Sequence, residues 1–443
     1  MTSISRKLGL VENLFEILHD LGAMIDVNVA RISGVLTPDI LRQALDFVQK
    51  RHPMLQVHIV ELADGVYFQS EGTTKIPLRV IEKQHENHCL EIAEEELHQK
   101  FSRGVEPLCR VTFLRSPKSN DMSEIIATFH HAITDGMSCM HFIHELLLYC
   151  HQIAEASLIS EAVTMPLLPP IENLVDRNLI CKSINEEISQ AAGNEIIKPK
   201  LIIEEDSSAN ECRTRLIFKS LTNENTSNLI NRCKQEETTV HGALCAAMLF
   251  AVAKCFDIDE SINLLCGSNV SLRKYCNIEI KDNYIGCLIS LLVIMHTLHG
   301  NTNFWDLARE CKSKLSQAID RGVHIDKINS NDLNAMDKKL IIQMSEFNMG
   351  RTSTINISNR GKYKFLDNYG KLQLKEFYFS TGQHIIGTYF WLGAMTFHEQ
   401  LFCSFAHVVP LLSNKTAGLL AQDVVDMLQK AHETDDLTLN LSN

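Results

Sequence analysis

The sequence has no apolar run long enough to cross a membrane or to direct export. The longest apolar stretches, 243–253 and 287–295, reach about half of a bilayer span, and we expect both to be buried. Glu12, Glu16 and Asp20 interrupt the region where a signal peptide would be continuously apolar. We therefore predict a cytoplasmic protein without a membrane span.

An excess of basic charge and paired cysteine motifs are also missing. The formal net charge is -12, from 54 acidic and 42 basic side chains, which argues against a nucleic-acid or anionic-membrane partner. The 14 cysteines include no CxxC pair, so without an export signal we expect reduced thiols rather than disulfides. Neither a P-loop motif nor GxGxxG is present, which leaves nucleotide-phosphate chemistry unsupported.

The chain is long enough for two domains, since 443 residues exceed one ordinary core. We expect an α/β fold with an N-terminal lobe at residues 1–165 and a C-terminal lobe at residues 211–443. The segment between them, 166–210, opens with three prolines and closes with an acidic and serine-rich run. Such a composition is typical of a crossover linker.

Strands and helices alternate along both lobes. Thr37 as N-cap, Pro38 at the first helical position and apolar residues at helical spacing predict a helix that ends at His52-Pro53. The other predicted strands are 26–32, 55–60, 110–114, 125–129, 215–218, 262–271, 352–358, 387–397 and 401–405. The other predicted helices are 92–101, an apolar helix after residue 136, 226–236, 240–256, 304–319 and 413–432.

The most informative segment is 123–149, in which two histidines follow a short predicted strand. His130 and His131 stand at the strand end, and a Thr-Asp-Gly turn separates them from an apolar helix. Neighbouring strand residues point to opposite sides, so only one histidine can face a given site. Imidazole suits proton abstraction because its unperturbed pKa lies near working pH. The alternative is that both histidines only satisfy hydrogen bonds at a buried strand end.

The heptapeptide HHAITDG at 130–136 resembles the HHxxxDG signature of CoA-dependent acyltransferases and peptide-synthetase condensation domains, which share the chloramphenicol-acetyltransferase-like fold. Other segments are similar to this superfamily in the same order along nearly the whole chain. They are Arg51-His52-Pro53-Met54-Leu55, Pro107-Leu108-Cys109-Arg110, Thr239-Val240-His241-Gly242-Ala243, Asn269-Val270-Ser271-Leu272-Arg273, Asn283-Tyr284-Ile285-Gly286 and Ser358-Asn359-Arg360-Gly361.

The resemblance implies two lobes, each a mixed sheet with flanking helices, and an active-site tunnel at their interface. It also implies that His131 is the general base in direct transfer of an acyl group from a thioester to an alcohol or amine. No cofactor would be bound permanently, and acyl-CoA or acyl-phosphopantetheine would be the co-substrate. The expected partners are a small-molecule acceptor and a thioester donor, with an acyl carrier protein as an alternative donor. Candidate donors for the oxyanion are Asn359, Ser380 and Thr381.

Three roles are open for Asp135: orienting His131 as in a triad, capping the helix, or pairing with an arginine of the other lobe. By position, the resemblance identifies that arginine as Arg273. We favour this structural role, because a buried Asp–Arg pair fixes geometry more often than it performs chemistry. His130 belongs to the same structural motif, and Gly136 is expected to give the turn its backbone freedom.

The sequence also contains a spacing that could bind zinc. His141 and His144 stand three residues apart on the predicted helix, but the segment does not match HExxH or HxxEH, and no further ligand cluster is evident. We therefore predict a solvated or core-lining helix face and no metal.

Some features of related families are absent. Residues 366–370 read LDNYG where plant acyltransferases of the superfamily carry DFGWG, and no carrier domain accompanies the chain as in peptide synthetases. Stand-alone alcohol acyltransferases, including polyketide-associated ones, are therefore the most similar type. The alternatives are a carrier-protein-dependent condensation enzyme and a catalytically silent binding protein of the same fold. The acidic net charge disfavours an acidic carrier.

Overall fold

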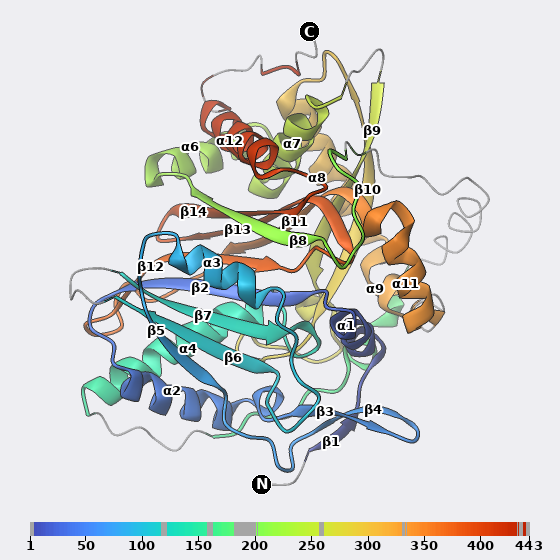
Figure 1. The fold of residues 1–443 in the computed structure, drawn as a ribbon. Coiled ribbons are helices and arrows are strands. Elements are labelled where there is room, and N and C mark those ends of the chain that lie inside the picture. Colours follow the sequence, from blue (N-terminus) through green and yellow to red (C-terminus); the bar gives the residue numbers. More distant parts are fainter. Residues whose placement is uncertain are drawn as a thin grey trace.

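The computed structural model describes residues 4–116, 122–156, 163–180, 201, 203–256, 261–329, 333, 335–431, 433 and 437–439. These residues form two lobes, one above the other in Figure 1, with the N-terminal lobe below and the C-terminal lobe above. Each lobe contains a mixed sheet covered by helices, which confirms the predicted α/β class.

The N-terminal lobe is built on a sheet with the strand order β12-β2-β7-β6-β5. All neighbours are antiparallel except β5 and β6, which are parallel. The strands are β2 (Ile25–Ser33), β5 (Leu78–Glu82), β6 (Cys109–Arg115), β7 (Ser123–His130) and β12 (Gln373–Thr381). A smaller antiparallel sheet contains β1 (Ser5–Lys7), β3 (His58–Leu62) and β4 (Gly65–Gln69).

Helices cover both faces of the N-terminal sheet. Helices α2 (Pro38–Arg51) and α4 (Gly136–Ala154) lie below the sheet in Figure 1, and α3 (His88–Glu96) lies above it, next to the C-terminal lobe. Helix α1 (Leu10–Asp20) lies at the side, near the level where the lobes meet. As predicted, the side chain of Thr37 caps α2 by accepting the Ile40 N–H at 3.3 Å.

Strand β12 crosses the expected boundary between the lobes. It belongs to the C-terminal half of the chain but pairs antiparallel with β2, from Gln373 opposite Ser33 to Thr381 opposite Asp26. It therefore covers an edge of β2 that would otherwise expose unpaired backbone groups. The assignment of all of 211–443 to the C-terminal lobe does not hold for this strand, because it completes the N-terminal sheet.

The C-terminal lobe has a sheet with the order β10-β9-β11-β13-β14-β8. The pairs β9–β11 and β11–β13 are parallel, and the others are antiparallel. The strands are β8 (Arg213–Ser220), β9 (Ser261–Ser271), β10 (Ile289–His299), β11 (Arg351–Lys362), β13 (Gly387–Phe397) and β14 (Gln400–Val409). The helices are α6 (Asn223–Gln235), α7 (Val240–Ala253), α8 (Phe304–Asp320), α9 (Val323–Asn329), α11 (Lys338–Glu346) and α12 (Asn414–Lys430).

Short 3-10 helices connect several of these elements. They are η1 (Pro53–Leu55), η2 (His131–Ile133), η3 (Ile171–Asn173), η4 (Arg177–Leu179), η5 (Arg273–Tyr275) and η6 (Phe347–Gly350). Two of them, η2 and η5, carry residues of the predicted site.

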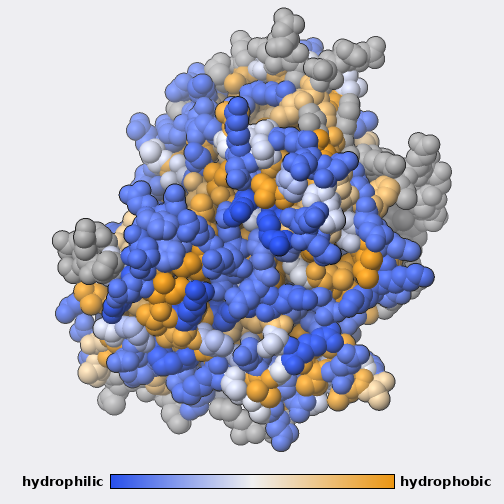
Figure 2. Space-filling view, in the orientation of Figure 1, coloured by the Kyte–Doolittle hydropathy of each residue, from blue (hydrophilic) through white to orange (hydrophobic). Residues whose placement is uncertain are grey.

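Of the two apolar segments singled out in the sequence, 243–253 is buried as expected, whereas 287–295 is only partly buried, because Leu291 and Met295 of β10 are exposed. Helix α7 is buried from Gly242 to Ala253, above the C-terminal sheet in Figure 1. Among the described residues, no helix combines the length and apolarity needed to cross a bilayer. Hydrophobic residues on the face in Figure 2 form separate patches among hydrophilic ones. Every cysteine within the described ranges is free.

A buried histidine between the lobes should make folding stability depend on pH. Burial, with His98, Arg213 and Arg351 nearby, lowers the pKa of His384 to about 3. The ring therefore stays neutral in the folded protein, whereas the unfolded chain binds a proton below about pH 6.5. Acidification from about pH 6.5 toward pH 4 is expected to lower the free energy of unfolding by about 1.4 kcal/mol per pH unit through this group.

Urea unfolding of the wild type and of His384→Gln across this pH range measures the effect. The variant should lose less stability on acidification, because glutamine binds no proton in the unfolded chain. Equal losses of stability in both proteins would contradict a role for His384 in the pH dependence.

Candidate active site

The HHxxxDG segment connects the end of β7 to the start of α4. Strand β7 is buried along its length and ends at His130, and His131 opens η2. Asp135 then caps α4 because its carboxylate accepts the Ser138 N–H at 2.8 Å. A buried strand, a single tight turn and a capped helix thus hold the two histidines in fixed positions.

His130 uses both ring nitrogens within the protein. Its Nδ1 accepts the Ala132 N–H at 3.1 Å, so the proton lies on Nε2, which donates to Glu16 Oε2 at 2.9 Å. Burial, followed by the charges of His131 and Arg103, lowers the pKa of His130 to about 3. This neutral, fully bonded ring has no nitrogen free for a substrate.

His131 has a different environment. Its ring stacks on that of Phe15 from α1, with centroids 4.2 Å apart and an interplanar angle of 4°. Its Nδ1 is buried without a hydrogen-bond partner among the described residues, and its side chain lines a cavity of about 340 Å³. The structure therefore places His131, and not His130, at this cavity, whereas His130 lines a separate one of about 200 Å³ together with Glu16 and His19.

The cavity lies between the lobes. One wall comes from the N-terminal lobe, through α1 and His131, and the other from β9, β10, β11 and β13 of the C-terminal sheet. Of the three predicted oxyanion donors, Thr381 lines the cavity, whereas Ser380 and Asn359 do not. Asn359 Oδ1 instead accepts the Gly361 N–H at 2.9 Å.

Sequence reasoning missed Phe15, Asn269 and Asn356 as lining residues. Asn269 does begin one of the segments that carry the family resemblance, which was a usable signal. For Phe15 and Asn356 no sequence signal existed, because only the folded chain brings them next to His131.

Asp135 is joined to Arg273 of the other lobe. Asp135 Oδ1 accepts a hydrogen bond from Arg273 Nη2 at 2.8 Å, and both side chains are only 4% exposed. The hydroxyl of Ser138 also donates to Asp135 Oδ1, at 2.7 Å, and accepts the Gly286 N–H at 3.1 Å. Asp135 makes no hydrogen bond to His131 within the described structure. The geometry thus gives this carboxylate capping and pairing contacts and no triad contact.

Gly136 does not play the expected conformational role. Its φ is not positive, so the turn does not require the freedom of glycine. A Cβ at this position would lie 2.8 Å from Nε of Arg360, which enters from β11. Arg360 also donates to Asn28 Oδ1 at 2.6 Å. The role of Gly136 is therefore steric, because the missing side chain allows an arginine of β11 to approach the N-terminal sheet.

Two clusters in the described ranges bring three metal-ligating atoms within 4.8 Å of one another. The first contains Glu16, His19 and His130. His19 Nε2 accepts the Phe101 N–H at 2.8 Å, so the His19 nitrogen that faces Glu16 carries a proton, as does that of His130. Because a metal needs the nitrogen lone pair, these contacts form a hydrogen-bond network and do not suit an ion.

The second cluster contains His52, His141 and Glu145. Arg51 Nε lies 2.6 Å from Glu145 Oε1, and His52 contacts the other carboxylate oxygen. Arg51 already neutralises the carboxylate, which leaves little attraction for a cation. His144 is not part of the cluster, since its Nδ1 contacts the Tyr369 hydroxyl at 2.7 Å. The predicted His141–His144 pair is therefore split between two environments.

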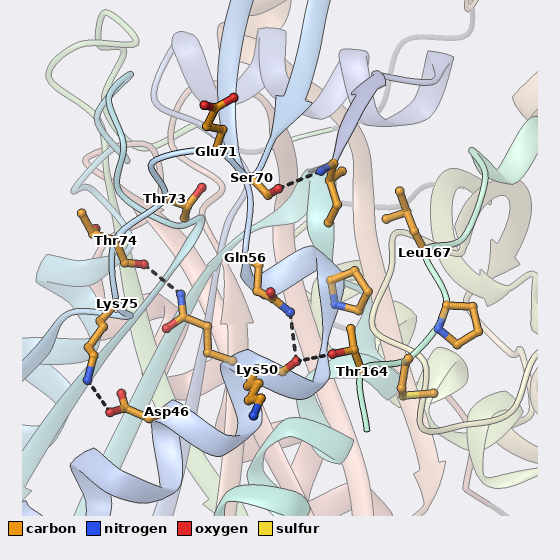
Figure 3. A pocket seen from close by; sticks show the side chains of 15 residues that line it. Asp46, Lys50, Gln56, Ser70, Glu71, Thr73, Thr74, Lys75, Thr164 and Leu167 are labelled. Carbon is orange, nitrogen blue, oxygen red and sulfur yellow. Dashed lines mark hydrogen bonds and ion pairs between the residues drawn. The ribbon is translucent and has the colours of Figure 1, made fainter. Parts of the chain in front are cut away.

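A larger cavity, of about 1000 Å³, lies beside α2 and residues 164–167 (Figure 3). Its polar groups bond to one another: Lys75 to Asp46 at 2.6 Å, and Thr164 to the Lys50 carbonyl at 3.2 Å. The described residues that line it include neither histidine nor cysteine. Size alone does not make it a chemical site.

Comparison with known proteins agrees with this arrangement. Residues 24–165 match the family model of the condensation domain, and residues 212–382 match that of the phthiocerol/phthiodiolone dimycocerosyl transferase C-terminus. No curated protein sequence matches the chain.

Solved structures share the fold over almost the entire chain. Polyketide synthase associated protein 5 from Mycobacterium tuberculosis is 14% identical, with 96% of this chain and 98% of that chain covered and a TM-score of 0.67. Trichothecene 15-O-acetyltransferase from Fusarium sporotrichioides is 11% identical, with coverage of 96% and 95% and a TM-score of 0.74. The first condensation domain of the calcium-dependent antibiotic synthetase is 11% identical, with coverage of 99% and 98% and a TM-score of 0.69. The chain belongs to the superfamily of condensation domains and acyltransferases with the chloramphenicol-acetyltransferase-like fold.

Proposed function

We propose that this protein transfers an acyl group from a thioester to the hydroxyl or amine of a small acceptor, with His131 as general base. The observation that carries the proposal is the contrast between the two motif histidines. His130 is bonded at both nitrogens, whereas His131 lines the cavity between the lobes and its Nδ1 has no hydrogen-bond partner among the described residues.

The geometry supports a direct transfer. Nδ1 of His131 is buried, so Nε2 is the nitrogen that can take the proton of a bound acceptor. The acceptor oxygen or nitrogen then attacks the thioester carbonyl, and the carbon–sulfur bond breaks when the tetrahedral intermediate collapses. The thiolate leaves and takes up the proton held by His131. The stack on Phe15 limits the orientations of the ring during both transfers.

The oxyanion of the intermediate needs hydrogen-bond donors in the same cavity. Thr381 has a donor hydroxyl and lines it, and we propose this residue in place of Asn359 and Ser380. The donor substrate would be acyl-CoA or an acyl-phosphopantetheine arm. Donor and acceptor would reach His131 through separate openings of a tunnel between the lobes.

A carrier-dependent condensation reaction is the second candidate. It is favoured by the condensation-domain match at residues 24–165. It requires a carrier protein to bind, whereas the simple transferase accepts a free acyl-CoA.

A panel of acyl-CoAs with simple alcohols and amines tests the proposal. Acyl transfer from free CoA thioesters that disappears in His131→Ala is the expected result. Transfer only from acyl carrier proteins would favour the condensation reaction. If no donor reacts and His131→Ala does not alter ligand affinity, the protein is a binding protein of this fold.

A further inference from the structure

The two walls of the His131 cavity differ in chemistry. Helix α1 contributes apolar side chains, among them Leu14 and Phe15. The C-terminal sheet contributes most of the polar ones, among them Asn269 on β9 and Asn356 on β11, together with apolar side chains such as Leu291 and Trp391. Of the described residues that line the cavity, only Lys327 carries a formal charge, and no carboxylate is present. The polar wall is therefore almost uncharged.

Asn269 and Asn356 lie on the same face of the sheet. Asn356 is paired in register with Gly267, and Asn269 follows two residues later on β9, so both side chains are on the same side. Gly267 provides the space, because a Cβ there would lie 2.5 Å from Asn356 Nδ2. Gly267 thus makes room for the Asn356 carboxamide on the face that also carries Asn269.

The described part of the protein leaves the oxygen atom of each carboxamide unsatisfied. The Oδ1 atoms of Asn269 and Asn356 are buried and have no hydrogen-bond partner among the described residues. Asn356 is also only 8% exposed as a whole residue. A buried polar group without a partner is costly, and such groups are rare except where a ligand or water completes them.

Three other polar side chains of this wall, Thr352, Thr388 and Gln383, are already bonded, whereas the buried Ser290 Oγ has no hydrogen-bond partner among the described residues. The hydroxyls of Thr352 and Thr388 donate to the carbonyls of Gly387 and Ser353, each at 3.0 Å. Gln383 Oε1 accepts the Thr388 N–H at 3.1 Å, and its Nε2 donates to the Thr381 carbonyl, also at 3.1 Å. These contacts hold strand ends together and leave the two carboxamides and the Ser290 hydroxyl as polar groups available to a ligand.

We propose that Asn269 and Asn356 bind neutral hydroxyl or amide groups of a substrate, and so select a polar substrate over a plain hydrocarbon one. A carboxamide offers both a donor and an acceptor but no charge, and hydroxyl and amide groups complement both. This proposal rests on the proposed function, because it calls the ligand a substrate of acyl transfer. The binding preference itself can be measured without turnover.

Two sources can supply this chemistry. One is an acceptor with several hydroxyls, and the other is the amide-bearing arm of the thioester donor. Matched pairs separate them: hexanetriol against hexanol for the acceptor, and S-acetyl-N-acetylcysteamine against ethyl thioacetate for the donor. Within each pair the main difference is the number of hydroxyl or amide groups.

Equilibrium titration of the full chain with all four compounds is the test. In at least one pair the polar member should bind about tenfold more tightly, as expected for one or two hydrogen bonds to otherwise unpaired groups. The pair that shows the preference identifies the source. In Asn356→Leu and Asn269→Leu the ratio should fall toward one.

Asn263→Leu is the matched control, since Asn263 is on the same strand but is exposed and outside the cavity. It should keep the wild-type ratio. Equal binding within both pairs, or an unchanged ratio in both cavity variants, would overturn the proposal and point to water as the partner of the carboxamides. A binding preference without acyl transfer to any acceptor would leave this proposal standing and refute the proposed function.

Discussion

His131→Ala is expected to lower the rate of acyl transfer by a factor of about 10²–10⁴, the usual contribution of a positioned general base. The thermal melt should change little. Within the described residues His131 makes no side-chain hydrogen bond or ion pair that its removal would strand, and its ring stacks on Phe15. Steady-state rates at saturating donor and acceptor, with a melt of each protein, measure both effects.

A matched control is His85→Ala, because His85 is half exposed and is not a lining residue of the cavity. This variant should keep wild-type activity. A His131 variant that retained more than about a tenth of the activity would show that another group takes the proton.

Asp135→Ala should damage stability more than any other change in the motif. It leaves Arg273, which is 6% exposed, without its carboxylate partner, and breaking such a buried pair costs about 3–5 kcal/mol. The loss of the cap on α4 adds about 1 kcal/mol. Urea unfolding should therefore show a large loss of stability and a poor yield of folded protein.

Two further variants separate the pair from the cap. Asp135→Asn can still accept the Ser138 N–H but loses the charge, so it should be less destabilising than Asp135→Ala. The effects of Arg273→Ala and Asp135→Ala should not add in the double variant, because both remove the same contact. An Asp135→Ala protein that melts normally but is as inactive as His131→Ala would instead support the triad interpretation.

Local rules predicted the elements whose signals lie within a few residues. The helix beginning at Pro38 has its cap, its proline and its apolar spacing in one short segment, and α2 follows them. Strand β13 has the predicted bounds, Gly387–Phe397, because an apolar run defines it. The predicted helix at 92–101 occurs earlier, as α3 at His88–Glu96. Its first residue could not be recognised in the sequence, because no side chain caps its first turn.

Elements that depend on distant partners were not predicted. Strand β12 forms through pairing with β2, more than three hundred residues earlier in the sequence, and nothing local indicates that pairing. Helix α1 was read only as an interruption of a signal peptide, although Phe15 from this helix stacks on His131. The predicted strand at 55–60 begins as η1 and becomes β3 only at His58.

The candidate site shows the same division. The motif histidines and Asp135 could be found because they lie close together in one segment, and the family resemblance identified Arg273 by position. The oxyanion candidates Asn359 and Ser380 lie on strands of the right region but are not lining residues of the cavity. Side-chain direction at the end of a strand depends on register and bulges, and β11 has a register shift between Asn359 and Lys362.

A single-turnover experiment tests the central claim most directly. The full chain is mixed with excess acyl-CoA and an alcohol or amine that the panel identifies, quenched at short times, and analysed by mass spectrometry for product and for protein mass. Direct transfer with His131 as base predicts product without an acylated protein, and almost no product from His131→Ala. An acyl group that accumulates on the protein before product appears, or equal product from His131→Ala, would contradict it.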